Sequence, residues 1–517
     1  MAEFGSAIMI WTMVMFACGG GLVTWLAIPV ILRRLAFLKQ NGVSQPHHTQ
    51  KRERARLGGL AMVISFLIIS VAISFWFPGD AAQAQTRWAV VCSVAAMFLL
   101  GFWDDLKPLG ARKKLIGQIL IALAAWCAGI HIEAFKNPLT GSICQLGPIG
   151  GCALTVFWLI ALPNLINLID GMDGLAGGIA LMLMGLLCYA GWGGSAAFPA
   201  LCAAGMVGAL IGFLRYNFPP ARIYMGDGGA YFIGFLMAEL SIINSHKGTI
   251  AAGLLAPLFV LALPIADVSL AILRRGVRGI PIFRPDQRHI HHKLLGIGYT
   301  PRRAVLTLYF LSLIFLVLGL VMFLSQGRWA PALFGVACLV FILSARCFSF
   351  SREWFAVGRV LGNSIEMRET IQYALTMSHW LEMEAARCGS MENLWLDFEF
   401  LAMKLNFAHV KLVLPDGIRE WRKKGDGQFP PAQMRHFSRE LGGNGCMVLE
   451  LEMEAAEDLF SNLCDITCEA WLKAATRWAA MNGLPVGFRA HTHSNARDHH
   501  RKGERPHVPI PRDWTPA

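Results

Sequence analysis

Long apolar stretches without charged residues recur along the first two thirds of the chain, and they restrict its possible folds more than any other feature. Residues 174–214, for example, contain no charged side chain. A helix of about 20 apolar residues crosses the hydrocarbon core of a bilayer, where backbone polar groups must be paired within the segment. We therefore predict an all-α polytopic membrane region with about 11 transmembrane helices, near residues 7–32, 57–77, 85–103, 115–131, 150–168, 175–192, 196–214, 229–245, 249–272, 304–324 and 330–345.

The basic residues beside these stretches predict the orientation in the membrane. The loop after the first stretch carries Arg33, Arg34, Lys39 and four more basic residues, whereas the next loop, PGDAAQAQTR, carries one. Because short cytoplasmic loops are rich in Lys and Arg, the first loop is expected in the cytoplasm and the amino terminus outside. The net charge of +12 is then part of this positive-inside bias, and no nucleic-acid partner is expected.

The composition changes where the apolar stretches end. Beyond that point, residues 410–417 and 446–453 have the pattern of strands, and residues 454–480 form an amphipathic stretch without Gly or Pro that is typical of a helix. The chain is thus predicted to hold three parts: a transmembrane domain at 1–347, a small cytoplasmic α+β domain of unknown role at 348–488, and a disordered basic tail rich in His and Pro at 489–517.

Polar residues are costly in hydrocarbon, so their positions beside the apolar stretches indicate where chemistry can occur. They cluster at the predicted cytoplasmic face. The first cluster places Asp104 and Asp105 at the end of the third predicted helix and Lys114 at the start of the fourth. Carboxylates can bind a metal ion or act as bases, and a lysine can bind phosphate as a point charge. An interfacial helix cap beside positive-inside lysines would produce the same pattern, and both interpretations remain open.

The second cluster, Asn164, Asn167, Asp170 and Asp173, repeats every three residues at the end of the fifth predicted helix. Side chains three residues apart lie near one another on a helix, so these four are expected to form one polar stripe. A polar stripe on a membrane helix must face protein, water or a ligand. We interpret the stripe as part of a ligand site, with a helix-packing stripe as the alternative.

The third cluster is centred on Asp227, which lies between glycines directly before the eighth predicted helix. A helix amino terminus carries free N–H groups that favour phosphate, although an ordinary helix cap explains a GDGG turn equally well. Mg²⁺, or Mn²⁺ in its place, takes one or two protein carboxylates together with waters and substrate phosphates. Asp227 with Asp170 or Asp173 is therefore a chemically reasonable metal site.

The fourth cluster lies in a basic loop at 274–298 and contains Arg288, His289, His291 and His292. A zinc site would need a complementary set of Cys or His ligands, which the rest of the sequence does not supply. Because many arginines accompany the histidines, binding of a nucleotide diphosphate is the favoured interpretation. An inert basic loop is the alternative.

These four clusters, in this order and on one face, resemble the polyprenyl-phosphate N-acetylhexosamine-1-phosphate transferase family. The resemblance covers about residues 57–298 and includes the sequence LGGLAM at Leu57–Met62. The sequence HIHH at 289–292 is similar to that of the undecaprenyl-phosphate GlcNAc-1-phosphate transferase branch. The consecutive histidines followed by an acidic residue that mark the phospho-MurNAc-pentapeptide translocases are missing. The part of the chain after Phe348 lies beyond the resemblance.

The resemblance implies a multi-pass enzyme of the bacterial inner membrane that transfers N-acetylhexosamine-1-phosphate, GlcNAc-1-phosphate in this branch, from a UDP-sugar to undecaprenyl phosphate. UMP would be released, the product would begin a cell-envelope polysaccharide, and Mg²⁺ or Mn²⁺ would be required. A second copy of the chain is a further candidate partner. The implied roles are catalytic for Asp104, Asp105, Asp170 and Asp173, substrate-binding for Lys114, Asn164, Asn167, Arg288, His289, His291 and His292, and metal-binding for Asp227 and Asp170.

A lipid or ion transporter is the alternative from another functional class. Transporters tend to place charged residues near the middle of the membrane, in broken helices. The charged clusters of this chain instead collect at one face. Glu239, within the eighth predicted helix, is the residue that most favours a transporter.

Overall fold

The computed structural model describes residues 2–40, 55–107, 109–136, 142–192, 197–245, 257–263, 265–267, 269, 272, 294–295, 297–325, 328–347, 357–414, 417–423, 434–441, 447–455 and 457–482. The loop segment with Arg288, His289, His291 and His292 lies outside these residues, as does the predicted tail at 489–517. The chain divides into two compact units, Met1–Asn363 and Ser364–Ala517, each of which is described by itself.

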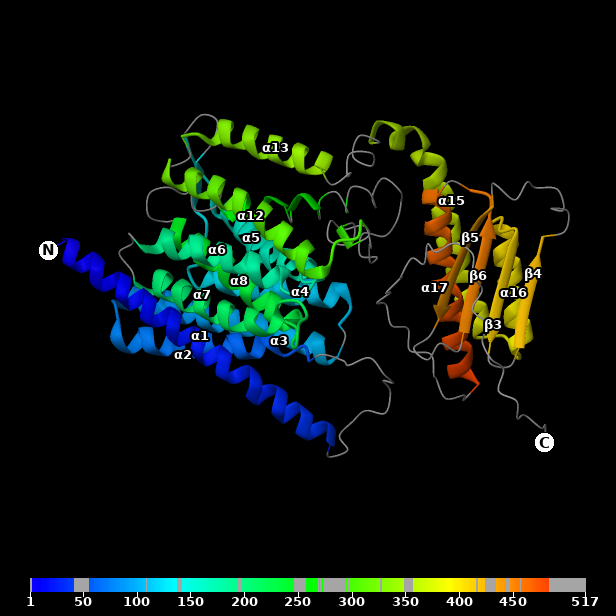
Figure 1. Ribbon diagram of the computed structural model, residues 1–517, viewed down its shortest axis with the longest axis horizontal. Coiled ribbons are helices and arrows are strands. Elements are labelled where there is room, and N and C mark those ends of the chain that lie inside the picture. The colour runs from blue at the N-terminus through cyan, green and yellow to red at the C-terminus, as the bar shows by residue number, and fades with distance from the viewer. Residues whose placement is uncertain are drawn as a thin grey trace. The chain divides into compact units, whose positions relative to one another are not determined.

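The first unit is a bundle of helices (Figure 1). Two short antiparallel strands, β1 (Ala134–Lys136) and β2 (Ile143–Gln145), lie between α4 and α5. The helices in the described part of this unit include α1 (Ala2–Gln40), α2 (Gly58–Trp76), α3 (Ala81–Leu106), α4 (Ala111–Cys127), α5 (Pro148–Ile169), α6 (Leu175–Trp192), α7 (Ala197–Asn217), α8 (Gly226–Ser245), α12 (Pro301–Leu324) and α13 (Ala330–Cys347).

Seven of the described helices are long and apolar enough to cross a membrane: α2, α3, α5, α6, α7, α12 and the segment Ile8–Arg34 of α1. Each coincides with a predicted span, so the prediction of a helical, multi-pass membrane region is confirmed. Helices α4 and α8 also form where spans were predicted, but they are not among the seven, and α13 contains a shorter apolar segment, Ala330–Leu343. The predicted span at 249–272 lies largely outside the described residues. The prediction of about 11 spans is thus supported for seven of them.

Helix α8 is enclosed by its neighbours in the first unit. It contacts α2, α3, α5, α6 and α7, and every residue from 228 to 242 is buried. A helix that is apolar on all sides is stable only when other helices surround it, and the run AYFIGFLMA meets that condition. The enclosed position of α8 places its amino terminus, with Asp227 in the first turn, beside the carboxyl-terminal ends of α3 and α5.

The second unit combines helices with one antiparallel sheet in the order β4-β3-β6-β5 (Figure 1). Alternate residues of the two central strands are fully buried, with Val410 opposite Leu451 and Leu412 opposite Leu449. This period of two is typical of a sheet with one face against a core, and Trp471 belongs to the same core. The elements are α15 (Val357–Ala385), α16 (Met391–Lys404), β3 (His409–Leu414), β4 (Gly417–Arg422), β5 (Arg435–Leu441), β6 (Met447–Met453) and α17 (Glu457–Met481).

The predicted strands at 410–417 and 446–453 are confirmed as β3 and β6, and the predicted helix at 454–480 is confirmed as α17. The edge strands β4 and β5 were not expected, because at least half of the residues in their sequences, GIREWR and RHFSREL, are charged or polar. They become strands through pairing with the central ones. Opposite charges meet across the sheet, as between Lys411 and Glu450 at 3.2 Å.

Candidate active site

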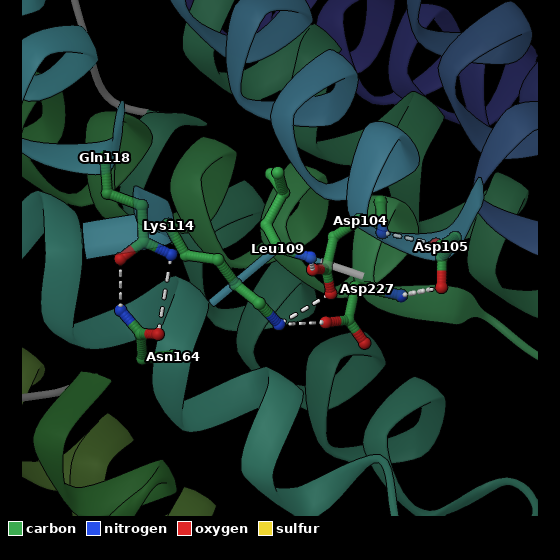
Figure 2. Close-up of polar contacts among 8 residues, drawn as sticks. Asp104, Asp105, Leu109, Lys114, Gln118, Asn164 and Asp227 are labelled. Atoms are coloured by element: carbon green, nitrogen blue, oxygen red, sulfur yellow. Dashed lines mark hydrogen bonds and ion pairs between the residues drawn. The ribbon is translucent and has the colours of Figure 1, made fainter. Parts of the chain in front are cut away.

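The carboxyl-terminal end of α3 meets the amino terminus of α8 through the carboxylate of Asp105. The backbone N–H of Asp227 donates to Asp105 Oδ1 at 3.1 Å, and that of Gly228 donates to Oδ2 at 2.9 Å (Figure 2). The first N–H groups of a helix have no partner within the helix, so Asp105 supplies one from a distant part of the chain. Both oxygens of Asp105 are occupied, and the residue positions α8.

Glycines allow the backbones of α3 and α8 to approach closely at this point. A Cβ atom added to Gly101 would lie 2.6 Å from the carbonyl oxygen of Asp227 and 2.7 Å from the Cα of Gly228. One added to Gly228 would lie 3.0 Å from the backbone nitrogen of Phe102. A larger residue at Gly101 would therefore separate the two helix ends.

We expect the substitution Gly101→Ala to lower both stability and activity, because the contacting atoms belong to the backbone and cannot rotate away. Overpacking of this kind costs about 1–3 kcal/mol. The midpoint of thermal unfolding in detergent would measure this loss of stability. Gly185→Ala is the matched control, since a Cβ at Gly185 in α6 would meet no atom within 4 Å. Equal unfolding midpoints for the two variants would contradict the expectation.

Lys114, in the first turn of α4, links two carboxylates of the site. Its Nζ lies 2.6 Å from Asp104 Oδ2 and 3.1 Å from Asp227 Oδ2 (Figure 2). The other oxygen of Asp104 accepts a hydrogen bond of 2.6 Å from the backbone N–H of Leu109. Burial lowers the pKa of Lys114, but the hydrogen bond to Asp104 and the charge of Asp227 outweigh it and hold the pKa above its ordinary value. Lys114 is therefore a fixed positive charge between α3, α4 and α8.

The predicted polar stripe of α5 lies partly against this cluster. Asn164 exchanges two hydrogen bonds with Gln118 of α4, at 2.8 and 3.4 Å (Figure 2). The side chain of Asn167 lies near enough to the carboxylate of Asp227 to help lower the pKa of that carboxyl. Burial raises the pKa of Asp170 well above its ordinary value, and the charges of Asp227 and Asp105 raise it further. The structure thus brings Asn167 and Asp170 to Asp227, one helix turn apart.

Asp173 departs from the predicted stripe. Helix α5 ends at Ile169, so Asp173 lies beyond the helix in a turn. Its Oδ2 accepts a hydrogen bond of 2.8 Å from the backbone N–H of Ala221. Nearby, Asn217 accepts from the N–H of Gly174 at 3.0 Å and donates to the carbonyl of Ile223 at 2.9 Å. Asp173 therefore helps to hold the segment that leads into α8.

Two residues of the site were not singled out by the sequence analysis. Gln118, which is 1% exposed, holds Asn164. Arg56 lies directly before α2, and its positive charge acts on both Asp105 and Asp170. The backbone on both sides of Arg56 is held by Tyr224. The N–H of Tyr224 donates to the carbonyl oxygen of Ala55, and the N–H of Gly58 donates to the carbonyl oxygen of Tyr224, each at 2.9 Å. The block LGGLAM, which follows Arg56 at once, was the signal that could have indicated it.

The residues of the site fit a divalent cation. Within the described part of the chain, no three His, Cys, Asp or Glu side chains form a ready metal-ligand set. Mg²⁺ does not need three, because one or two carboxylates are completed by waters and substrate phosphates. Asp170 and Asp227 lie close enough for the charge of one to disfavour ionisation of the other. A divalent cation would offset that repulsion.

The predicted diphosphate-binding residues Arg288, His289, His291 and His292 lie outside the described residues, so their role stays a prediction. Six of the predicted site residues come together at one end of the bundle, although up to 123 positions separate them in the chain. They are Asp104, Asp105, Lys114, Asn167, Asp170 and Asp227. Carboxylates gathered in this way suit a divalent cation that is shared with substrate phosphates, and the lysine adds a positive charge that can bind phosphate directly.

Comparison with known proteins identifies a family and several relatives to which the sequence of this chain is similar. The model of glycosyl transferase family 4 matches residues 87–245, which include α4 to α8 and the part of α3 from Arg87 onward. A probable undecaprenyl-phosphate N-acetylglucosaminyl 1-phosphate transferase of Bacillus subtilis is 32% identical over 304 residues, covering 58% of this chain and 82% of that protein.

Two further relatives carry related names. A decaprenyl-phosphate N-acetylglucosaminephosphotransferase of Mycolicibacterium smegmatis is 31% identical over 312 residues, or 56% of this chain and 76% of the relative. A phospho-N-acetylmuramoyl-pentapeptide-transferase of Desulforudis audaxviator is 30% identical over 332 residues, or 58% of this chain and 94% of the relative.

Proposed function

The chain belongs to the polyprenyl-phosphate sugar-1-phosphate transferase family, a family of bacterial multi-pass membrane enzymes, and we propose that it transfers GlcNAc-1-phosphate from UDP-GlcNAc to undecaprenyl phosphate. The observation that carries the proposal is the cluster in which Lys114 joins Asp104 to Asp227 at the amino terminus of α8. The product would begin a cell-envelope polysaccharide. The basic loops support a cytoplasmic position for the site and for the second unit.

In the proposed reaction, an oxygen of the polyprenyl phosphate attacks the β-phosphorus of the UDP-sugar. A new bond forms between that oxygen and the β-phosphorus. The bond from the β-phosphorus to the bridging oxygen breaks, and its electron pair leaves with UMP. Such a transfer needs positioning and charge stabilisation more than covalent participation by the protein. Lys114 and Arg56 would offset charge on the phosphates, while Asp105 holds the helix terminus in place.

A two-step route, with Asp104 as a nucleophile, is the mechanistic alternative. Both oxygens of Asp104 are already engaged, one by Lys114 and the other by the backbone of Leu109. A carboxylate in these bonds is a weak nucleophile, which favours direct transfer. Incubation of the enzyme with labelled UDP-GlcNAc and no acceptor would distinguish the routes, because only the two-step route leaves a labelled phosphosugar on the protein.

The proposed cofactor is Mg²⁺, or Mn²⁺ in its place. Asp227 and Asp170 would hold the ion, since the charge of Asp227 disfavours ionisation of Asp170 and a divalent cation would offset that repulsion. When bound, it would neutralise charge on the donor diphosphate and so assist departure of UMP. Chelation with EDTA is expected to stop transfer, and added Mg²⁺ is expected to restore it.

We assign the sugar from the names of the relatives. The proteins of Bacillus subtilis and Mycolicibacterium smegmatis are named for N-acetylglucosamine, and that of Desulforudis audaxviator for an N-acetylmuramoyl-pentapeptide. Purified protein with undecaprenyl phosphate and Mg²⁺ should release UMP from UDP-GlcNAc faster than from UDP-GalNAc or UDP-MurNAc-pentapeptide. A reaction without lipid acceptor is the control. UMP release from none of the three donors would contradict the proposed function.

A further inference from the structure

A fully buried carboxyl group lies in the interior of the helix bundle, away from the cluster of carboxylates. Glu239 of α8 is 0% exposed, and its Oε1 accepts a hydrogen bond of 2.6 Å from the hydroxyl of Ser93 on α3. Its Oε2 has no hydrogen-bond partner among the described residues. Burial of such a group is costly. Glu239 is therefore expected to serve a purpose that an apolar residue cannot.

The Ser93–Glu239 pair and the Asp105–Asp227 contact both join α3 to α8, and they do so in the same register. Asp105 lies twelve residues after Ser93 on α3, and Asp227 lies twelve residues before Glu239 on α8. Because Asp105 binds the backbone of Asp227, the two helices run antiparallel and are tied at two levels in one register. Twelve residues of helix span about 18 Å. The buried pair thus anchors the helices about three turns below the site.

Glycines bring the two backbones together in the upper part of this helix contact. Gly101 and Gly228 allow backbone to lie against backbone, with no Cβ on either residue. Because these two glycines have no side chains, they contribute no hydrogen bond that would set the register of the two helices. A single buried polar pair, in contrast, is satisfied in only one register, which is how buried polar residues specify alignment in helical coiled coils.

We propose that the Ser93–Glu239 hydrogen bond fixes the register of α3 against α8 and thereby positions Asp105 and Asp227 for the transfer reaction. Both residues act as positioning residues, without contact to the substrates. The inference rests on the proposed function, since its main readout is the rate of transfer. Glu239 was the residue that most favoured a transporter, and a positioning role in the enzyme explains its burial without any transport activity.

Three substitutions test the proposal. Glu239→Leu and Ser93→Ala each remove the hydrogen bond, whereas Glu239→Gln retains a polar partner for Ser93. We expect kcat to fall between about tenfold and a hundredfold in the first two variants, because small displacements of reacting groups have effects of this size. KM for both substrates should stay near the wild-type value, and Glu239→Gln should recover most of kcat. Combining Ser93→Ala with Glu239→Leu should cost no more than Glu239→Leu alone.

The control variant is Ser70→Ala, which removes a buried hydroxyl on α2 that has no hydrogen-bond partner among the described residues. It should keep the wild-type kcat. The proposal is overturned if folded Ser93→Ala and Glu239→Leu retain wild-type kcat, or if Glu239→Gln is as slow as Glu239→Leu. If Glu239→Leu does not fold, the kcat values of Ser93→Ala and Glu239→Gln test the proposal instead. Absence of transfer by the wild-type protein would instead contradict the proposed function, so the two failures are distinct.

Discussion

Asp227→Asn is expected to reduce transfer by about a thousandfold, which is the upper range for loss of one preorganised electrostatic group. Asp227 is the point at which the site converges. It pairs with Lys114, lies near Asn167, and is within electrostatic reach of Asp105 and Asp170. The amide of asparagine has nearly the same shape but no charge, so it would weaken both the pair with Lys114 and the proposed metal site. UMP release at saturating substrates measures the effect.

The matched control for this variant is Asp80→Asn at the opposite end of α3. Asp80 caps that helix by accepting the backbone N–H of Gln83 at 2.8 Å, and asparagine caps helices equally well. Asp80→Asn should therefore retain wild-type transfer and wild-type thermal unfolding. Transfer by folded Asp227→Asn within tenfold of wild type would show that Asp227 does not hold a central role.

Lys114→Gln is expected to reduce kcat/KM for the UDP-sugar by about a hundredfold or more, because hydrogen bonds to charged groups in such sites have effects of this order. The substitution removes the positive charge between Asp104 and Asp227, whose carboxylates then repel each other. It also removes a cation that the donor phosphates would meet. Lys114→Arg keeps the charge but changes the geometry, and an intermediate loss is expected.

Lys113→Gln is the control, since it removes the same charge from the same helical turn at an exposed position. Steady-state rates at varied UDP-GlcNAc and varied Mg²⁺ would separate the two effects of Lys114. If excess Mg²⁺ restored Lys114→Gln fully, the lysine would serve only to neutralise the carboxylates. Equal rates for the Lys113 and Lys114 variants would contradict a specific role for Lys114.

Several parts of the site could be predicted because they depend on local sequence. Asp227 lies in the first turn of α8, and Asp104 and Asp105 lie in the last turn of α3, as the ends of the apolar stretches indicated. The strands β3 and β6 were also predicted, because their alternation of buried and polar residues is local. In contrast, β4 and β5 have no such alternation of apolar residues and form through pairing with their neighbours.

The different roles of adjacent carboxylates could not be predicted. Asp104 and Asp105 are neighbours in the chain, yet Asp104 binds Lys114 while Asp105 binds the backbone of α8. Asp173 continues the spacing of three that starts at Asn164, but the helix ends before it and its carboxylate binds Ala221. Spacing indicates a shared helix face only as long as the helix continues.

Hydropathy and the ends of the apolar stretches were enough to predict a helical membrane region and the helix termini that carry the carboxylates, because these properties depend on residues close together in the chain. The family was identified separately, from the resemblance of the four polar clusters in their order along the chain. The pairing of Lys114 with Asp104 and Asp227, the approach of Asn167 to Asp227 and the bond between Ser93 and Glu239 depend on helix packing. These contacts join residues far apart in the chain. Only the tertiary structure decides them, because they depend on which helix surfaces pack against one another.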